Sequence, residues 1–474
     1  MQPHEAESAL DRFLRLFSDV RSGEGGRALL LALNIFLILT AYSVLKPIRE
    51  ALILGGYSAQ LKAYLSAAQV VLLAGLVPLY GMIAGRVPRR RLINTVTAFF
   101  VGCLVLFYIL AQSEIPVGIP FFVWIGIFSV MIIAQFWSFA NDIYTNDEGE
   151  RLFPIVGFGG ALGAVSGAFT TRILIDALGV YQLMLLAAGL LILGLMITNY
   201  VDRKERHRTE SHLPLSSTTA EIPAATGEFR METGEFKLPT EGEAEPEGSS
   251  AFALVFRTRY LLLIGLLVML LNWVNTNGGF ILDMTVENAS KEALAAGTGD
   301  GLTVEESIGT FYASFQGVVN LLVLLIQLFL VSRILKYVGA KWAITFLPAI
   351  ALGGYILLAF YPVLGAIRWA KTAENSTDYS LNNTVRAVLF LPTTREQKYK
   401  AKQAIDSFFH RAGDVLSALV VFVGTTYFAL SASGFAMVNI ALVLIWLTIA
   451  VIIGRGYQRL VDSGRPPVMR RKTA

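Results

Sequence analysis

The chain has 474 residues, of which 54% are hydrophobic and 16% charged, with a mean hydropathy of +0.58 and a formal net charge of +4. This composition excludes an ordinary soluble domain and predicts an all-α integral membrane protein. One cysteine excludes an internal disulfide, and four scattered histidines give no Cys/His spacing for a metal site, so we expect neither metal nor cofactor.

The first half of the chain is predicted to hold six spanning helices. Residues 1–26 lack the basic start and small-residue cleavage site of a signal peptide, so we expect a cytoplasmic segment followed by a first helix that acts as the insertion signal. Apolar segments of about 20 residues are long enough to cross a bilayer. Such segments lie near residues 27–54, 60–85, 92–112, 119–142, 153–177 and 181–200.

A polar stretch separates these helices from six more. Residues 201–256 contain four prolines and two copies of Thr-Gly-Glu-Phe, a composition that predicts a disordered cytoplasmic linker. Apolar spans resume near residues 257–282, 307–332, 340–361, 363–390, 403–428 and 435–454. We therefore predict twelve transmembrane helices in two six-helix halves, 27–200 and 257–454, followed by a basic cytoplasmic tail at 455–474.

The span at 363–390 is charged enough for a hydropathy scan to reject it. Lys and Arg collect in cytoplasmic loops, and counting this segment as a span keeps the main basic clusters on one side of the membrane. Lys62 and Lys291 are the exceptions. We therefore predict that 363–390 crosses, buried among other helices, and that both termini are cytoplasmic.

The two halves echo each other. Arg86 follows the second span as Arg333 follows the eighth, and a Thr-x-x-Glu helix start at Thr145 corresponds to one at Thr393. Two like-oriented six-helix halves joined by a long cytoplasmic linker resemble the layout of a major-facilitator transporter, whose site lies between the halves near the midplane.

Charges interrupt the first span. Lys46 and Arg49 lie three residues apart, hence on one helix face, and Glu50 adjoins them. An ionisable side chain at membrane depth normally faces a bundle interior or a water-filled cavity. These residues therefore predict an anion-binding position.

The tenth span has one polar face. Spacings of three and four residues place its side chains together on a helix, and they are Arg368, Lys371, Asn375, Asp378 and Asn382. A further basic residue, Arg386, follows this face. Two interpretations stay open: the face lines a cavity, or Lys371 pairs with Glu374 or Asp378 and locks the helix against its neighbours.

The eleventh span opens with another polar face, which is either a solvated helix end or part of a gate. Lys402, Asp406, His410 and Asp414 follow at intervals of four. Asp406 and Asp414 would then be acidic partners of a closing salt bridge or of a proton-coupling site. The residues that we expect to act in gating or coupling are Arg86, Arg151, Arg333, Asp406, Arg411 and Asp414.

Glycines and asparagines mark two further helices. Gly159, Gly163 and Gly167 recur at every fourth position, which is typical of close helix packing, and no Gly-Lys-Ser/Thr follows to suggest a nucleotide loop. In the seventh span, three asparagines, Asn272, Asn275 and Asn277, precede Gly278-Gly279. This pattern predicts either a broken, cavity-lining helix or interhelical hydrogen bonds.

Four sequence segments carry a resemblance to a known family. They are Tyr42-Ser-Val-Leu-Lys46-Pro-Ile-Arg49-Glu50, Phe136-Trp-Ser-Phe-Ala-Asn141-Asp142, Arg151-Leu-Phe-Pro154, and Leu391-Pro-Thr-Thr-Arg-Glu-Gln-Lys-Tyr-Lys400 leading into Lys402-Gln-Ala-Ile-Asp406. With them the chain resembles the ATP/ADP translocase family of bacterial and plastid nucleotide transporters. The resemblance implies nucleotide exchange across a membrane, with basic helix residues holding the phosphates, and no enzymatic activity.

Three positions differ from that family's pattern. Lys46-x-x-Arg49-Glu50 replaces a basic-x-x-Lys-Asp motif, Ile125 stands where a glutamate is expected, and Asp414 stands where a lysine is expected. The resemblance therefore supports an anionic substrate better than a particular nucleotide. One alternative is a proton-coupled carrier of another organic anion with Asp378 or Asp414 as the proton site. Another is a membrane enzyme acting on lipid-linked phosphates, for which only His410 qualifies.

The predicted substrate site draws on both halves of the sequence. Lys46 and Arg49, with Lys371 or Arg368, would hold phosphates. Asn141, Asn375 and Asn382 would supply hydrogen bonds to base or ribose. The full set of expected substrate-binding residues is Lys46, Arg49, Glu50, Asn141, Asp142, Arg368, Lys371, Asn375, Asp378, Asn382 and Arg386. We expect a monomer in a bacterial inner membrane, with an anionic small molecule and lipid as partners and no nucleic acid.

Overall fold

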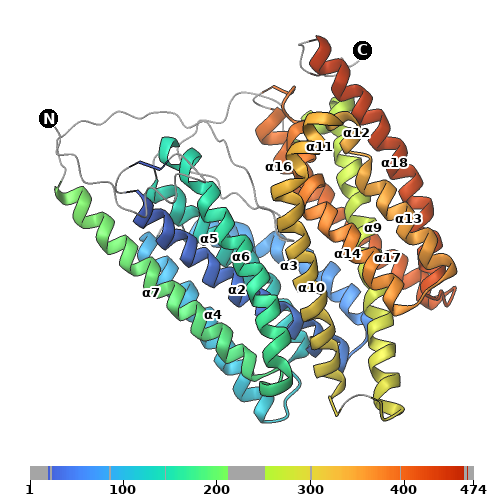
Figure 1. Ribbon diagram of the computed structural model, residues 1–474, viewed down its shortest axis with the longest axis horizontal. Helices are drawn as coiled ribbons and strands as arrows, with labels where there is room; N and C mark the ends of the chain where they lie inside the picture. The colour runs from blue at the N-terminus through green and yellow to red at the C-terminus, as the bar shows by residue number, and fades with distance from the viewer. Residues whose placement is uncertain are drawn as a thin grey trace. The chain divides into compact units, whose positions relative to one another are not determined.

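The computed structural model describes most of the chain as helix (Figure 1). The described residues are 20–21, 24–84, 87–144, 146–211, 251–298, 301–394, 397–463 and 467. Within these ranges every regular element is helical and no strand occurs. The predicted all-α fold class is therefore confirmed.

The first six long helices follow the predicted spans within a few residues, except that α6 starts earlier and α7 continues further. They are α2 (Gly25–Gly56), α3 (Ala59–Ala84), α4 (Arg89–Gln112), α5 (Gly118–Ile143), α6 (Asn146–Leu178) and α7 (Gln182–Ser211). Helix α7 thus enters the predicted linker 201–256, and a short helix, α8 (Ala251–Arg257), lies at the other end of that linker.

The second set of helices is more interrupted. The α-helices are α9 (Arg259–Ala295), α10 (Val304–Phe329), α11 (Val331–Tyr337), α12 (Ala340–Ala343), α13 (Phe346–Phe360), α14 (Leu364–Thr377), α15 (Asn383–Leu389), α16 (Lys402–Ala404), α17 (His410–Thr426) and α18 (Ala432–Ser463). Three π-helical segments join some of them: η1 (Asp378–Asn382), η2 (Gln397–Ala401) and η3 (Ile405–Phe409).

Eleven helical segments in the described part of the chain are long and apolar enough to span a bilayer. The predicted span outside this group is 363–390, whose charges lower its hydropathy. In the structure α14, η1 and α15 form one continuous helical segment there. That this segment crosses the membrane stays a prediction.

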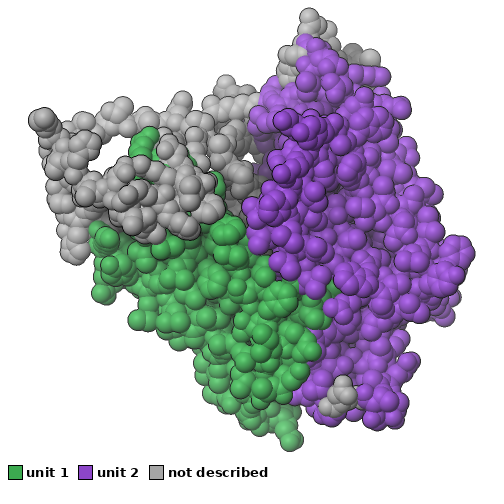
Figure 2. Space-filling view, viewed as in Figure 1, with its two compact units in different colours: residues 1–51, 79–229, 312–317 green, residues 52–78, 230–311, 318–474 purple. Residues whose placement is uncertain are grey.

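The chain divides into two compact units (Figure 2). One contains residues 1–51, 79–229 and 312–317, and the other contains 52–78, 230–311 and 318–474. The units differ from the predicted halves of the sequence in two places. Residues 52–78, which are the end of α2 and most of α3, belong with the second unit, and residues 312–317 of α10 belong with the first.

In the first unit, α6 packs against α2 through its glycines. An added Cβ at Gly159 would lie 2.5 Å from the carbonyl oxygen of Ala32, and Gly163 and Gly167 meet the carbonyls of residues 36 and 40 in the same way. Both helices advance by four residues between contacts, so they run parallel and in register. The prediction that these glycines serve packing is confirmed.

In the second unit, α9 packs against α17, α18 and α14. Gly413 of α17 lies against the backbone of Met269 and Trp273, where a Cβ would be 2.7 and 2.8 Å from backbone atoms. Helix α9 is unbroken through Gly278-Gly279, so the broken-helix alternative is wrong. Its asparagines hydrogen-bond to other helices instead. For example, Asn277 donates to Asn439 over 3.1 Å.

Candidate functional site

Lys46 and Arg49 lie in the second half of α2, on either side of a proline. Pro47 cannot donate a helical hydrogen bond to the carbonyl four residues earlier. The buried Lys46 ammonium lies 5.3 Å from the centre of the Tyr42 ring. Arg49 donates from Nε and Nη2 to Glu50 Oε1, and 22% of its side chain is exposed. Two cations and one carboxylate are therefore concentrated in a mostly buried part of the first unit.

The predicted residues at the end of α5 lie in a separate ion-pair cluster. Asp142 accepts a hydrogen bond from Arg89 over 2.9 Å, and the same guanidinium donates to Asp202 of α7 over 2.9 Å. Asn141 is exposed beside it. Asp142 thus connects the end of α5 to the start of α4. The residues next to Asp142 in the sequence do not indicate Arg89 as its partner.

Arg151, expected in a gate, forms a two-point ion pair. It donates to both oxygens of Glu24, and one turn away Arg27 donates to Glu148 over 2.8 Å. The hydrogen bond from Arg151 holds the pKa of the Glu24 carboxyl below its ordinary value, although burial opposes this shift. These pairs fasten the start of α2 to the start of α6.

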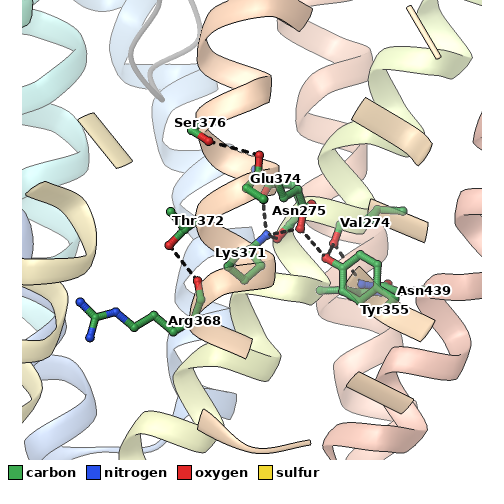
Figure 3. A network of polar contacts seen from close by, with 11 residues as sticks. Val274, Asn275, Tyr355, Arg368, Lys371, Thr372, Glu374, Ser376 and Asn439 are labelled. Carbon is green, nitrogen blue, oxygen red and sulfur yellow. Dashed lines mark hydrogen bonds and ion pairs between the residues drawn. The ribbon is translucent and has the colours of Figure 1, made fainter. Parts of the chain in front are cut away.

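Lys371 lies at the centre of a buried polar network in the second unit (Figure 3). Its ammonium donates to the side-chain oxygen of Asn275 over 2.7 Å, to the backbone oxygen of Asn275 over 3.2 Å and to Glu374 Oε2 over 3.0 Å. The side chains of Lys371 and Glu374 are only 3% and 4% exposed. Because an ammonium has three N–H donors, these contacts use all of its donors.

Two neighbouring helices complete this network. The Tyr355 hydroxyl of α13 donates to Glu374 Oε2 over 2.9 Å, and Asn439 of α18 donates to the Val274 carbonyl over 3.2 Å. Gly278 of α9 makes room, because a Cβ there would collide with the Tyr355 hydroxyl. This is the locking arrangement that the sequence left open, with Glu374 as the partner of Lys371. The sequence indicated neither Asn275 as a partner of Lys371 nor Tyr355 as a partner of Glu374.

The rest of the polar face continues through the π-helical segment η1. Asn382 donates to Asp378 over 2.7 Å, and both side chains are buried. Asn375 is also buried, and its Oδ1 has no hydrogen-bond partner in the described part of the chain. Single π-helical turns within α-helices occur frequently at functional sites.

The remaining basic side chains of this segment, Arg368 and Arg386, are both partly exposed, although two nitrogens of the Arg386 guanidinium are buried. The Arg368 guanidinium lies 5.5 Å from the centre of the Phe311 ring. Arg386 is half-buried in α15.

The two acidic residues of the eleventh span form hydrogen bonds and ion pairs with other side chains. Asp414 accepts hydrogen bonds from Asn272 over 2.7 Å and from Thr276 over 2.9 Å, with Arg411 at 3.6 Å. Asp406 lies 3.6 Å from Lys402, one turn earlier. Asp414 thus joins α17 to α9, next to the close contact at Gly413.

Of the other two predicted gate residues, one is exposed and one is not described by the structure. Arg333 of α11 is exposed and donates to the Phe329 carbonyl of the preceding helix. Arg86 lies outside the described residues, as does Thr145 at the expected helix start. At the corresponding start in the second half, the reciprocal capping pair is one residue later than expected, between Thr394 and Gln397. Among the described residues, no group of three His, Cys, Asp or Glu side chains is placed to hold a metal ion.

The comparisons with known proteins agree on the fold. The family model of the Major Facilitator Superfamily matches residues 16–373. The nucleoside transporter NupG has a TM-score of 0.56 at 12% identity, covering 92% of this chain and 99% of its own. A POT family transporter in complex with a thioalcohol-conjugated peptide has a TM-score of 0.59 at 14% identity, covering 92% and 96%.

A third similar structure is a bacterial homologue of the human lysosomal transporter Spinster, inward-facing and unoccupied. Its TM-score is 0.53 at 13% identity, with 92% of this chain and 97% of its own covered. At these identities the similarity shows the fold alone. No curated protein matches the sequence.

Proposed function

The chain belongs to the Major Facilitator Superfamily, and we propose that this multi-pass membrane transporter exchanges phosphorylated nucleotides of the ATP and ADP type. In this superfamily, transport proceeds by alternating access, in which two halves move about a site near the bilayer midplane. The cations of each compact unit and the resemblance to the nucleotide exchangers support a phosphorylated substrate.

The observation that carries the proposal is the charge within α2. Between residues 28 and 56 this helix has two cations, Lys46 and Arg49, and a single carboxylate, Glu50. Placing such charges at membrane depth is costly unless they meet water, a partner or a ligand. A nucleoside di- or triphosphate carries several negative charges, and guanidinium groups bind phosphate oxygens in bidentate fashion.

In the second unit, Arg368 is better suited than Lys371 to contact a phosphate. All three donors of Lys371 are used by Asn275 and Glu374. Arg368 is only half-buried and faces the Phe311 ring. We therefore assign Lys371 to the internal lock of the second unit and propose Arg368 as that unit's phosphate contact, with Arg386 as a further cation.

The test is exchange in proteoliposomes. Vesicles loaded with ADP are given labelled ATP, and uptake is compared for the unaltered chain, Lys46→Ala, Arg49→Ala and Arg368→Ala. We expect uptake by each variant to be lower by about tenfold or more, because a charge-assisted hydrogen bond contributes roughly 1.5–3 kcal/mol. Arg172→Ala, which removes an exposed arginine paired with Asp176 on α6, is the matched control. Full exchange by all three variants would contradict the assignment.

One observation favours a second candidate, a proton-coupled carrier of another organic anion. Asp414 is held between α9 and α17 by Asn272, Thr276 and Arg411. Uptake driven by a pH gradient into vesicles without internal nucleotide, and its loss in Asp414→Asn, would support this candidate. Strict dependence on internal nucleotide supports the antiporter.

The proposed membrane topology is also testable. We propose a monomer in a bacterial inner membrane with both termini in the cytoplasm, as the distribution of basic residues indicates. Reporter fusions at the two ends of the chain should both report the cytoplasmic side. A reporter at either end on the opposite side would contradict this topology.

A further inference from the structure

A short corner of the second unit carries positive charge without any acid to balance it. Residues 330–345 connect α10 to α13 through α11 and α12, and they include Arg333, Lys336 and Lys341. From residue 307 to residue 373 the sequence has no aspartate or glutamate. In the part of the chain that the structure describes, neither of these two lysines forms an ion pair. The corner is therefore a site of uncompensated positive charge.

An aromatic ring accompanies each lysine of this corner. The Lys336 ammonium lies 5.5 Å from the centre of the Tyr337 ring, and the Lys341 ammonium lies 5.5 Å from the centre of the Trp342 ring. Tyr337 is 77% exposed and Trp342 is 48% exposed. A contact with the face of a ring uses none of the three N–H donors of an ammonium. Each lysine thus keeps donors for an anion beside an exposed aromatic side chain.

The corner lies where the chain leaves and re-enters the membrane. The helices on either side of it are long and apolar enough to span a bilayer. Leu328 and Phe329, just before α11, are exposed and suit contact with lipid chains. Tryptophan and tyrosine concentrate at the level of the lipid headgroups. The position of Tyr337 and Trp342 therefore places the neighbouring lysines at the same level.

Helix α18 adds a further cation to this end of the second unit. Helices α12 and α18 pack together (Figure 1). Gly454 of α18 meets the backbone carbonyl of Lys341, where a side chain would collide. Arg455 follows directly and is exposed. The close contact at Gly454 thus brings an arginine to the part of the surface that carries Lys341.

The combination of charge and exposed apolar side chains favours a lipid over a soluble anion. Inorganic phosphate or a sugar phosphate would contact only the cations. An anionic phospholipid has a phosphate for the cations and acyl chains for Leu328 and Phe329. Basic clusters next to membrane-spanning helices attract anionic lipids for the same electrostatic reason.

We propose that Lys336, Lys341 and Arg455 bind the headgroup of an anionic phospholipid, with Tyr337 and Trp342 beside its glycerol backbone. We call this set of five residues the lipid corner. None of the five belongs to the proposed substrate site. The inference therefore goes beyond the proposed function.

The test measures stabilisation of the purified full-length chain in a neutral detergent. A ligand that binds the folded state raises the midpoint of thermal unfolding by mass action. Phosphatidylglycerol, phosphatidylcholine and glycerol 3-phosphate are added in separate titrations. We expect only phosphatidylglycerol to raise the midpoint. An equal effect of phosphatidylcholine would contradict recognition of an anion, and an equal effect of glycerol 3-phosphate would contradict a lipid as the occupant.

A double variant locates the site on the chain. Lys336→Gln with Lys341→Gln should require about tenfold or more phosphatidylglycerol for the same shift, because each basic residue near a membrane surface contributes to the attraction. The control is Arg172→Gln with Lys291→Gln, which removes the same charge at two other exposed cations and should respond like the parent. An unchanged lipid requirement in the lipid-corner variant would overturn the proposal.

A conservative variant separates charge from other effects of substitution. Lys336→Arg with Lys341→Arg keeps both cations and should keep the response to phosphatidylglycerol. Loss of the response in this variant would contradict binding by charge. These measurements require no transport, so absence of nucleotide exchange by the unaltered chain would count against the proposed substrate and not against the lipid corner.

Discussion

Arg151 donates a hydrogen bond to each carboxylate oxygen of Glu24, with N···O distances of 2.8 and 2.9 Å. A two-point pair of this kind fixes direction as well as distance. The two residues are 127 positions apart in the sequence. The three glycine contacts between α6 and α2, the first of which joins Gly159 to Ala32, have the same separation of 127 positions. The ion pair therefore sets the register that the glycines continue along the two helices.

This pair predicts an acid-sensitive contribution to stability. The hydrogen bond from Arg151 lowers the pKa of Glu24 in the folded chain relative to the ordinary value of about 4.3. A lowered folded-state pKa stabilises the fold fully above the unfolded-state pKa, and this contribution is lost as the pH falls through the folded-state pKa. We expect Glu24→Gln to lower the midpoint of thermal unfolding at pH 7. The difference from the unaltered chain should shrink below about pH 4. A difference that is constant with pH would contradict this origin.

The glycine seam predicts opposite effects for two glycines of α6. Gly163 lies against the Phe36 carbonyl, whereas a Cβ at Gly157 would meet nothing within 4 Å. Gly163→Ala should destabilise the fold by about 1–3 kcal/mol, because the helices must move apart. Gly157→Ala should be neutral or stabilising by up to about 1 kcal/mol, because alanine favours helix. Thermal unfolding of the two variants in the same detergent measures the contrast, and equal destabilisation would contradict it.

The sequence predicted the helices well because apolar length and charge placement are local properties. The segment at 363–390 is the exception: its charges argue against a membrane span, the distribution of basic residues favours one, and the structure forms the continuous helical segment of α14, η1 and α15 there. That this segment crosses the membrane stays a prediction. The glycine spacing likewise predicted close packing, since a repeat of four residues places all three on one helix face.

Pairing partners were much harder to predict, because each depends on which helices become neighbours. Lys371 could be paired with Glu374 by spacing alone, but Asn275 and Tyr355 come from two other helices. The sequence did not indicate that Asp142, which we expect in the substrate site, accepts a hydrogen bond from Arg89. Acidic residues near the end of an apolar helix, such as Asp283, were the available signal for a partner of Lys62, which donates to Asp283 over 2.7 Å.

Tyr355 and Gly278 are predicted to depend on each other. Gly278→Ala places a methyl group against the Tyr355 hydroxyl and should destabilise the fold by about 1–3 kcal/mol. Tyr355→Phe removes that hydroxyl and its hydrogen bond to Glu374, at a cost of about 1–2 kcal/mol. The combined variant should be more stable than the sum of the two losses predicts, because the phenylalanine leaves room for the methyl group. Additive losses in thermal unfolding would show that the hydroxyl is not the atom that excludes a side chain at residue 278.

Lys371 and Glu374 allow the sharpest test of the internal lock. Lys371→Met leaves the Glu374 carboxylate buried without its cation, which should cost about 3–5 kcal/mol of unfolding free energy. Adding Glu374→Gln removes the stranded charge and keeps an acceptor for the Tyr355 hydroxyl, so the combined variant should recover a large part of that loss. Arg172→Gln and Asp176→Asn, at an exposed pair, should show a coupling below about 1 kcal/mol. Single losses at Lys371 and Glu374 that simply add would mean that the ammonium and carboxylate are not paired in the folded chain, and Lys371 would again be a candidate for binding phosphate.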